Sequence, residues 1–167
     1  RAKSIVFTGA IEIWHLFDYE SDEQIHRSAF IKMMDNMKEA EHLGKQIRYR
    51  FGYSNLAFEL WVILHMVDCD RALSHRRKYL EILNRVYHES FRDMNEYKRE
   101  ANFKRCLRRL ELCNVICAVK RAKMIMQRNE QRGYILQQYK GYKYYKENPS
   151  LAIHEIIEKI FVDCNLM

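Results

Sequence analysis

The sequence contains one proline and five glycines among its 167 residues. Folds built mainly from short β-strands need many tight turns, and these two residue types commonly form them. Their scarcity therefore argues against a β-rich fold. A chain of this length can bury one hydrophobic core, so we expect a single domain over residues 1–167.

Long hydrophobic runs are also absent. The longest, LAFELWVILHMV at 56–67, is shorter than the roughly 20 residues that a membrane helix requires. It also contains Glu59 and His65, two ionisable residues that each need a partner if they are buried. We therefore expect a buried helix at this position and no membrane segment.

The sequence lacks the common catalytic and nucleotide-binding motifs. It contains no G-x-G-x-x-G and no glycine-lysine-serine/threonine phosphate loop. It also contains no H-E-x-x-H zinc motif and no G-x-S-x-G nucleophile motif. These absences favour a protein that is not an enzyme and that carries no cofactor.

Cysteine usage indicates a reducing compartment. The chain has five cysteines, an odd number without the regular spacing of a small disulfide-bonded secreted domain. The one N-x-S/T match, at 148–150, contains the proline that prevents glycosylation. We therefore expect a nuclear or cytoplasmic protein. Because the chain starts at Arg1, we also expect it to be an excised part of a longer protein.

Apolar residues recur at three- and four-residue steps along most of the chain, which is typical of helices. The sequence therefore predicts an all-α fold, a compact bundle of about six to eight helices. SDEQ at 21–24 reads as a capping box, Gly44 and Gly52 punctuate a connecting turn, and Asn148 with Pro149 starts the last helix. The expected helices cover residues 9–18, 21–44, 56–68, 74–94, 100–131, 133–146 and 149–164. The second of these should bury a stripe formed by Phe30, Met33, Met34 and Met37.

Positive charge is concentrated in one part of the chain. Residues 98–146 carry 14 Lys and Arg against three Asp and Glu, whereas residues 1–97 carry 14 against 15. A local basic block is the electrostatic mark of a surface that binds a polyanion or an acidic partner. The candidate binding residues are Lys104, Arg105, Arg108, Arg109, Lys120, Arg121, Lys123, Lys140, Lys143 and Tyr144.

The same helical arc carries apolar residues between its two basic clusters. Leu112, Val115, Ile116 and Val119 interrupt what would otherwise be a continuous basic track. An apolar segment flanked by Lys and Arg is typical of a helix that is covered by another helix. These four residues are therefore a candidate protein interface, either within the chain or with a partner.

The stretch QQYKGYKYYKENPS at 137–150 has two readings. Exposed tyrosines beside lysines can stack on bases while the cations hold phosphates. Tyrosines at helical spacing are, however, ordinary residues at the boundary of a core, and the lysines then keep the helix soluble. We expect the second arrangement.

Two sets of residues have a spacing that metal sites use. Glutamate precedes histidine by three residues at positions 12 and 15, 23 and 26, and 39 and 42, a spacing that di-iron bundles use. His65, Cys69, Cys113 and Cys117 could instead form a tetrahedral zinc site. We expect surface hydrogen bonds for the first set and core packing for the second, since free cysteines are commonly buried. No metal is therefore expected.

Together these features predict a non-enzymatic helical interaction domain. We expect it to act as a scaffold that binds a protein partner, or a second copy of itself as a homodimer, in an intracellular regulatory complex. The eight methionines suit adaptable apolar grooves. The alternative function is direct binding of RNA or DNA through the basic segment at 98–146.

Overall fold

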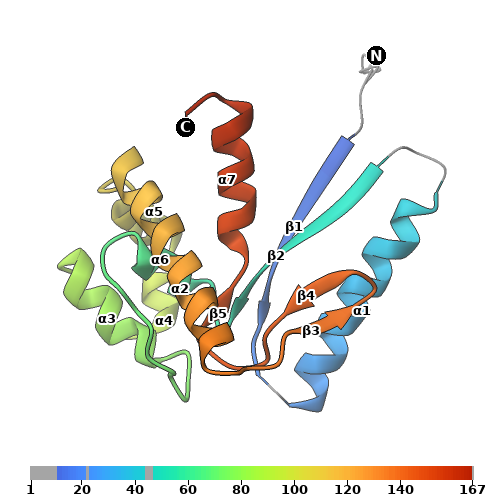
Figure 1. Cartoon of the computed structure of the whole chain (residues 1–167). Helices are drawn as coiled ribbons and strands as arrows, with labels where there is room; N and C mark the ends of the chain where they lie inside the picture. Colours follow the sequence, from blue (N-terminus) through green and yellow to red (C-terminus); the bar gives the residue numbers. More distant parts are fainter. Residues whose placement is uncertain (1–10, 22, 44–46, 167) are drawn as a thin grey trace, which may run out of the picture.

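The computed structural model describes residues 11–21, 23–43 and 47–166 (Figure 1). About 51% of the chain is helical and 17% is strand, so the predicted all-α bundle is wrong and the fold is mixed α/β. None of the helices in the described ranges is both long and apolar enough to cross a membrane. The elements are β1 (Ile11–Tyr19), α1 (Gln24–Glu41), β2 (Ile47–Asn55), α2 (Glu59–Leu64), α3 (Lys78–Tyr87), α4 (Met94–Tyr97), α5 (Glu100–Leu107), α6 (Leu112–Gln131), β3 (Gln137–Tyr139), β4 (Tyr142–Tyr144), β5 (Ser150–Leu151) and α7 (Ile153–Asp163).

The main sheet is built from a βαβ unit. β1 and β2 pair in parallel along their whole length, from Ile11 opposite Ile47 to Tyr19 opposite Asn55. Helix α1 makes the crossover between them, as parallel neighbours require. The short β5 adds an antiparallel pair at Ser54 and Asn55, which gives the strand order β1-β2-β5.

β1 lies where a helix was predicted at 9–18, and β2 lies where a turn was predicted at 44–52, so both predictions are wrong. Positions 9, 10 and 44–46 lie outside the described residues. The sequence of β2, IRYRFGYSN, alternates between large apolar and polar or small residues, which is the two-residue period of a strand. In β1, Ile13, Phe17 and Tyr19 share one face with the same period, and Trp14 and Asp18 lie on the other.

One face of the sheet packs against α1 through an aromatic core. Phe30, Met34 and Met37 of α1 are almost fully buried, as the stripe predicted for this helix requires. They pack with Phe51 and Tyr53 of β2. Helix α1 begins at Gln24, but its N-cap residue makes no side-chain capping bond, so the predicted capping box is wrong; Asp22 lies outside the described residues.

The basic, tyrosine-rich stretch forms a β-hairpin instead of a helix. β3 and β4 pair antiparallel around the two-residue turn Lys140-Gly141. Both turn residues have positive φ, 48° and 89°, which is the conformation that such tight hairpins need. Tyr142 and Tyr144 are buried at 6% exposure and pack into the aromatic core. Tyr142 therefore covers the core, as expected, but from a strand, and Tyr144, which the sequence offered as a binding residue, is buried there too.

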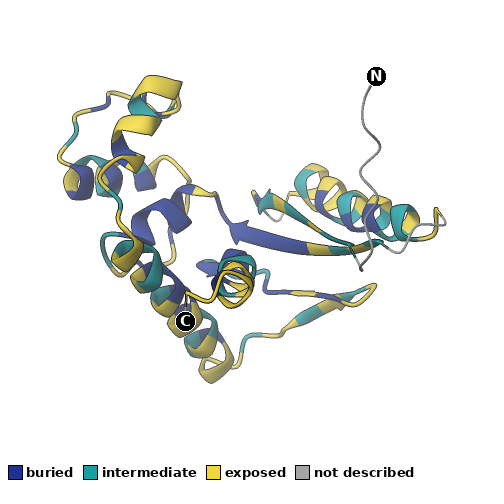
Figure 2. Ribbon diagram, turned by 90° about the horizontal axis from the view of Figure 1, so that it is seen from above, coloured by how far each residue is buried: buried dark blue, intermediate teal, exposed yellow. Residues whose placement is uncertain are grey.

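Helices α2 to α6 form a second core on the other side of the sheet (Figure 1). Helix α2 is buried on nearly every side, as its apolar sequence predicts. The long helix predicted at 100–131 is two helices, because Glu111 and Asn114 form a capping box that starts α6 and so ends the preceding helix. Figure 2 shows that β2 is buried toward its end; its last five residues are all buried, and Phe51 and Tyr53 among them belong to the aromatic core.

Helix α7 lies on the sheet face opposite α1 (Figure 1). It begins at Ile153, four residues after the predicted start, because Ser150 and Leu151 first pair with β2 as β5. Gly52 permits the close approach of α7. A Cβ at this position would lie 2.6 Å from Leu16 Cδ2 and 3.4 Å from Ile153 Cα.

Candidate functional site: an acidic pair at the strand ends

Two carboxylates meet where the parallel strands end. Asp18 is the penultimate residue of β1, and Glu59 is the first residue of α2, just after β2. Because Asp18 lies on the sheet face opposite α1, its side chain faces the helices that follow β2. The carboxyl ends of parallel strands are the usual place for ligands in α/β folds.

Glu59 is buried beyond what its partners explain. Its side chain is only 5% exposed, and Oε1 lies 3.3 Å from the Lys98 ammonium at the end of α4. Oε2 is buried without a hydrogen-bond partner in the described structure. A buried carboxylate oxygen without a partner is costly and calls for a ligand or a water to satisfy it.

Asp18 holds its proton near neutral pH. Burial raises its pKa to about 7, and the neighbouring Glu59 carboxylate raises it further by repulsion. The Lys98 charge and a hydrogen bond from the Phe58 backbone N–H lower the pKa of Asp18, but not to the ordinary value of a carboxyl. A carboxyl with such a pKa can exchange a proton at pH 7, and it releases that proton when a cation arrives.

Two buried tyrosines lie in the field of this pair. The hydroxyls of Tyr79 on α3 and Tyr97 on α4 are buried, and neither has a hydrogen-bond partner in the described structure. Burial raises the pKa of both phenols, and the Glu59 charge raises each further. Three polar atoms of one region, including Glu59 Oε2, therefore lack partners. Such a concentration is typical of a site that binds something polar.

Glu20 follows β1 and raises the pKa of Asp18 through its charge, but its ion pairs are with other residues. It is exposed, lies 3.3 Å from His26 Nε2 and 3.9 Å from Arg76 Nη1. Within the part of the chain that the structure describes, no group of three or more His, Cys, Asp and Glu side chains encloses a metal position. A cation at Asp18 and Glu59 would therefore take its remaining ligands from water and substrate.

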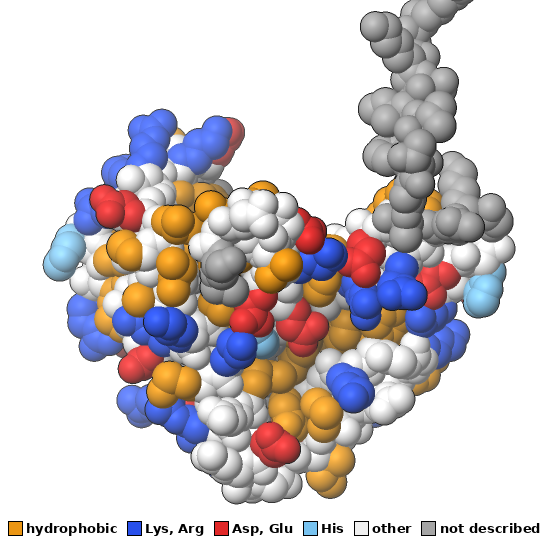
Figure 3. All heavy atoms as spheres, turned by 45° about the horizontal axis from the view of Figure 1, so that its top comes forward, with side chains coloured by type: hydrophobic (Ala, Val, Ile, Leu, Met, Phe, Trp, Pro, Cys, Tyr) orange, Lys and Arg blue, Asp and Glu red, His pale blue; other side chains and the backbone are white. Residues whose placement is uncertain are grey.

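Most candidate binding residues of the basic segment are paired inside the protein. Arg105 and Arg109 both contact Glu89, at 2.6 and 3.5 Å, and Arg121 contacts Asp68 at 3.2 Å. Lys104, Lys123 and Lys140 contact Glu100, Glu158 and Asp35. The structure thus uses the basic block mainly to neutralise acidic residues from the rest of the chain. Figure 3 accordingly shows basic and acidic side chains interspersed on one face of the molecule.

Three candidates keep an uncompensated charge. Arg108, Lys120 and Lys143 are exposed, and none forms an ion pair with a described residue. Arg108 and Lys120 lie on the helical side, whereas Lys143 lies in β4. Tyr144, the remaining candidate, is buried in the aromatic core. The structure therefore does not gather the candidates into one basic track.

The apolar residues predicted as a protein interface are mostly covered by the same chain. Val119 is 5% exposed in the helical core, and Val115 and Ile116 pack against that core. Leu112 is 49% exposed. A covering by helices of the same chain, one of the two arrangements expected from the sequence, accounts for three of these four positions.

The proposed metal ligands are not brought together. His65 and Cys69 are buried, whereas Cys113 and Cys117 are exposed on α6. Glu12 and His15, one of the spaced pairs, lie on a strand and therefore on opposite faces of the sheet. His65 contacts the Trp61 carbonyl oxygen through Nδ1 at 2.9 Å.

Sequence reasoning missed Asp18 and the tyrosines of the site. It identified Glu59 as a carboxylate in apolar surroundings that needs a partner, and Lys98 is that partner. The signal for Asp18 is its place directly after the largely apolar segment IEIWHLF at 11–17, but the periodicity of residues 9–18 predicts a helix there. An acidic residue that ends a buried strand would have been recognised as a site residue.

The molecule is thus an α/β protein with a parallel βαβ unit and an acidic pair at the carboxyl ends of its strands. Residues 7–160 match the family model of RloB-like proteins, so the chain belongs to the RloB-like family. No curated protein and no solved structure matches it.

Proposed function

We propose that this protein acts on the phosphodiester backbone of nucleic acid, with Asp18 and Glu59 holding a divalent cation. The single observation that carries this proposal is the buried pair itself. Lys98 lies 3.3 Å from Glu59 and acts on Asp18 through its charge, and one buried oxygen of Glu59 has no hydrogen-bond partner in the described structure. A divalent cation relieves both the repulsion and the missing contact.

The number of carboxylates points to magnesium chemistry. Mg²⁺ keeps several of its waters and is commonly held by one or two carboxylates together with substrate phosphates. Zn²⁺ and Ca²⁺ sites use more protein ligands than the described residues gather here. A site with two carboxylates therefore leaves coordination positions that water fills and that a substrate phosphate can take over.

The chemistry is hydrolysis of a phosphate ester. Water attacks phosphorus and gives up a proton, the bond to the leaving sugar oxygen breaks, and that oxygen takes up a proton. A divalent cation held by Asp18 and Glu59 would supply positive charge against the phosphate. Lys98, which lies 3.3 Å from Glu59 Oε1, would add positive charge in the same region.

The test is cleavage of nucleic acid by the purified protein in the presence of Mg²⁺ or Mn²⁺. Labelled single-stranded DNA, single-stranded RNA and duplex DNA are compared over one time course. Asp18→Asn and Glu59→Gln are expected to lose at least 100-fold in rate, whereas Glu89→Gln keeps the wild-type rate. Cleavage that survives Glu59→Gln, or that ignores removal of the cation by EDTA, would contradict the proposal.

The non-enzymatic, protein-binding function expected from the sequence stays a prediction. Of the four apolar residues on which it depends, only Leu112 is exposed. A well-folded dimer that neither binds a cation nor cleaves nucleic acid would favour that function over the one proposed here.

A further inference from the structure

A polar cavity lies along the outer edge of β2. Its volume is about 570 Å³, and it runs between β2, the β3–β4 hairpin and the start of α7. The walls carry the cations Lys38, Arg48, Arg50 and Lys143 against the two acidic residues Glu41 and Glu155. We call it the hairpin groove. Its size lies within the usual range for ligand pockets, roughly 300–1,000 Å³.

The cations of the groove are only partly neutralised. Lys38 pairs with Glu41 at 2.8 Å, and Arg50 lies 3.4 Å from Glu12. Arg48 and Lys143 are exposed and form no ion pair with a described residue. Two fixed positive charges therefore face the groove from opposite walls, one from β2 and one from the hairpin.

Aromatic side chains also line the groove. Trp14 of β1 is half-buried, lines the groove, and sits directly opposite Arg50 in the strand register. Tyr49 lines it from β2 and is also half-buried. Cations that can hold phosphates, interleaved with aromatic faces that can stack on bases, are the combination that single-strand binding uses.

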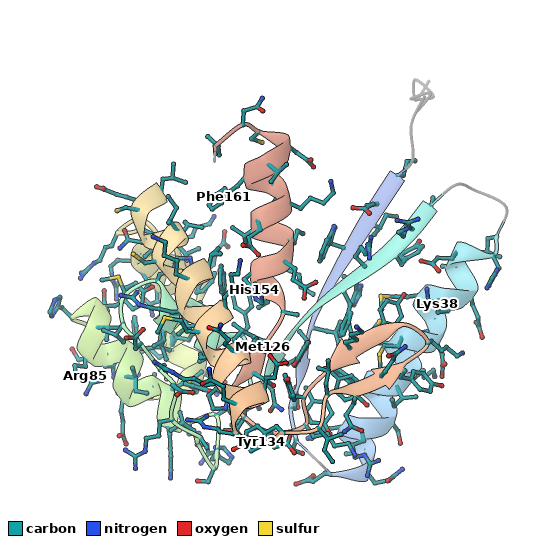
Figure 4. The ribbon with its side chains drawn as sticks, viewed as in Figure 1. Lys38, Arg85, Met126, Tyr134, His154 and Phe161 are labelled. Carbon is teal, nitrogen blue, oxygen red and sulfur yellow. The ribbon has the colours of Figure 1, made fainter. Side chains whose placement is uncertain are left out.

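A second cavity continues the groove past α7. It has a volume of about 440 Å³ and shares Lys143 and Glu155 with the first. His154 lines it at 8% exposure, and its Nδ1 is buried without a hydrogen-bond partner in the described structure. Figure 4 shows His154 at the start of α7 beside Met126 of α6, which lines the same cavity. A ring nitrogen in this position can hydrogen-bond a polar edge, such as that of a base.

The same edge of β2 is poorly suited to a peptide strand. The Tyr49 N–H donates to Glu41 Oε1 at 2.7 Å, and the Tyr49 carbonyl oxygen accepts from the Tyr142 hydroxyl at 3.4 Å. An added strand needs these backbone groups. Side chains of the protein already occupy them, so the groove fits nucleic acid better than an extended peptide.

We propose that the hairpin groove binds single-stranded nucleic acid, with Arg48, Arg50 and Lys143 on phosphates and Trp14 stacked on a base. The site deepens the proposed function, on which it rests for its choice of substrate. Trp14 and Asp18 lie on the same face of β1, four residues apart, so a strand held in the groove extends along the face that carries the acidic pair.

The test measures binding in EDTA, so that failure of the acidic pair and failure of the groove are distinguished. Anisotropy of a labelled oligothymidylate and of a matched duplex is recorded near physiological salt. Arg48→Glu with Lys143→Glu is expected to weaken single-strand binding at least tenfold. The matched control, Arg108→Glu with Lys120→Glu, makes the same charge change on the helical side and is expected to retain binding.

Tryptophan fluorescence gives an independent readout. The chain has two tryptophans, and Trp61 is buried in the helical core at 5% exposure. The oligonucleotide is expected to quench the Trp14 emission, and Trp14→Phe to remove the quenching and weaken binding about three- to tenfold. Unquenched emission on saturation would overturn the proposal. So would equal affinity of the wild type and the Arg48/Lys143 variant, or a loss confined to the Arg108/Lys120 variant.

Circular dichroism and thermal unfolding establish that each variant is folded before its affinity is interpreted. A wild-type protein that binds no oligonucleotide, yet takes up a peptide along β2, would also overturn the proposal and assign the groove to a protein partner.

Discussion

Glu89 and the Asp18–Glu59 pair are two ways of placing negative charge in one small protein. Glu89, next to α3, has one carboxylate and two arginine partners, Arg105 and Arg109. Hydrogen bonds from Arg105 lower its pKa. At the strand ends, Lys98 contacts Glu59 and acts on Asp18 through its charge, and the pKa of Asp18 rises to about 7.

The two regions differ in how their carboxylates are neutralised. Asp70, like Glu89, contacts two arginines, Arg128 and Arg132, each at 3.0 Å. In these places the basic segment neutralises acidic residues and holds the helices in position. At the strand ends Lys98 contacts Glu59, and Asp18 keeps its proton near pH 7. A cation from solution would replace that proton, which is the arrangement expected at a cation site.

The largest expected effect comes from removing one carboxylate of the pair. Mg²⁺ or Mn²⁺ at about 100 times its dissociation constant should stabilise the wild type by about 2.7 kcal/mol, which raises the Tm by roughly 5–10 °C. Glu59→Gln should abolish this rise, whereas Glu89→Gln should keep it. The Tm of each variant is measured over a series of cation concentrations. A Tm rise that Glu59→Gln retains would contradict the claim that only the strand-end pair binds the cation.

The second effect concerns the pH dependence of stability. The unfolded Asp18 titrates near 3.8, and the folded carboxyl titrates near 7. Below pH 4 both states are protonated and the residue costs nothing. Above pH 7 both are ionised, and the folded state pays up to about 4 kcal/mol. Asp18→Asn should therefore stabilise the protein increasingly from pH 4 to pH 7, measured by urea unfolding without divalent cations. A gain that is the same at pH 4 and pH 8 would contradict this.

A smaller effect is expected at Glu89. Glu89→Gln leaves two arginines without their carboxylate, but both guanidinium groups are more than 40% exposed and screened by solvent. We expect a loss of up to about 1 kcal/mol in the free energy of unfolding. The loss should shrink at high salt, and an unaltered stability at low salt would show that these pairs do not hold the helices.

The smallest effect is expected at Glu100. It pairs with Lys104 four residues along α5, and both side chains are more than half exposed. Glu100→Gln should change the free energy of unfolding by less than about 0.5 kcal/mol. A loss as large as that of Glu89→Gln would show that exposure does not separate the two kinds of pair.

The sequence predicted the helical parts better than the sheet. The buried stripe of α1 and the buried character of α2 follow from local periodicity, and both were predicted. The strand β2 also has a readable two-residue period, but Gly44 and Gly52 suggested a connecting turn. The parallel pairing of β1 with β2 joins residues 36 positions apart, so no local sequence pattern predicts it.

The candidate site was predictable only in part. Glu59 stands out because a carboxylate in an apolar run needs a partner. Asp18 gains its meaning from the strand that it ends and from the fold that places it near Glu59. The basic segment was visible in the sequence, but its internal partners, such as Glu89 and Asp70, come from elsewhere in the chain.

Calorimetric titration of Mg²⁺ and Mn²⁺ into the wild type and Glu59→Gln, in two buffers of different ionisation enthalpy, tests the central claim most directly. At pH 7 we expect one cation to bind the wild type and to release about half a proton, because Asp18 is then about half protonated. The release should vanish above pH 8.5, and Glu59→Gln should bind no cation. Equal binding by both proteins, or none by the wild type at millimolar concentration, would contradict the assignment of Asp18 and Glu59 as a cation site.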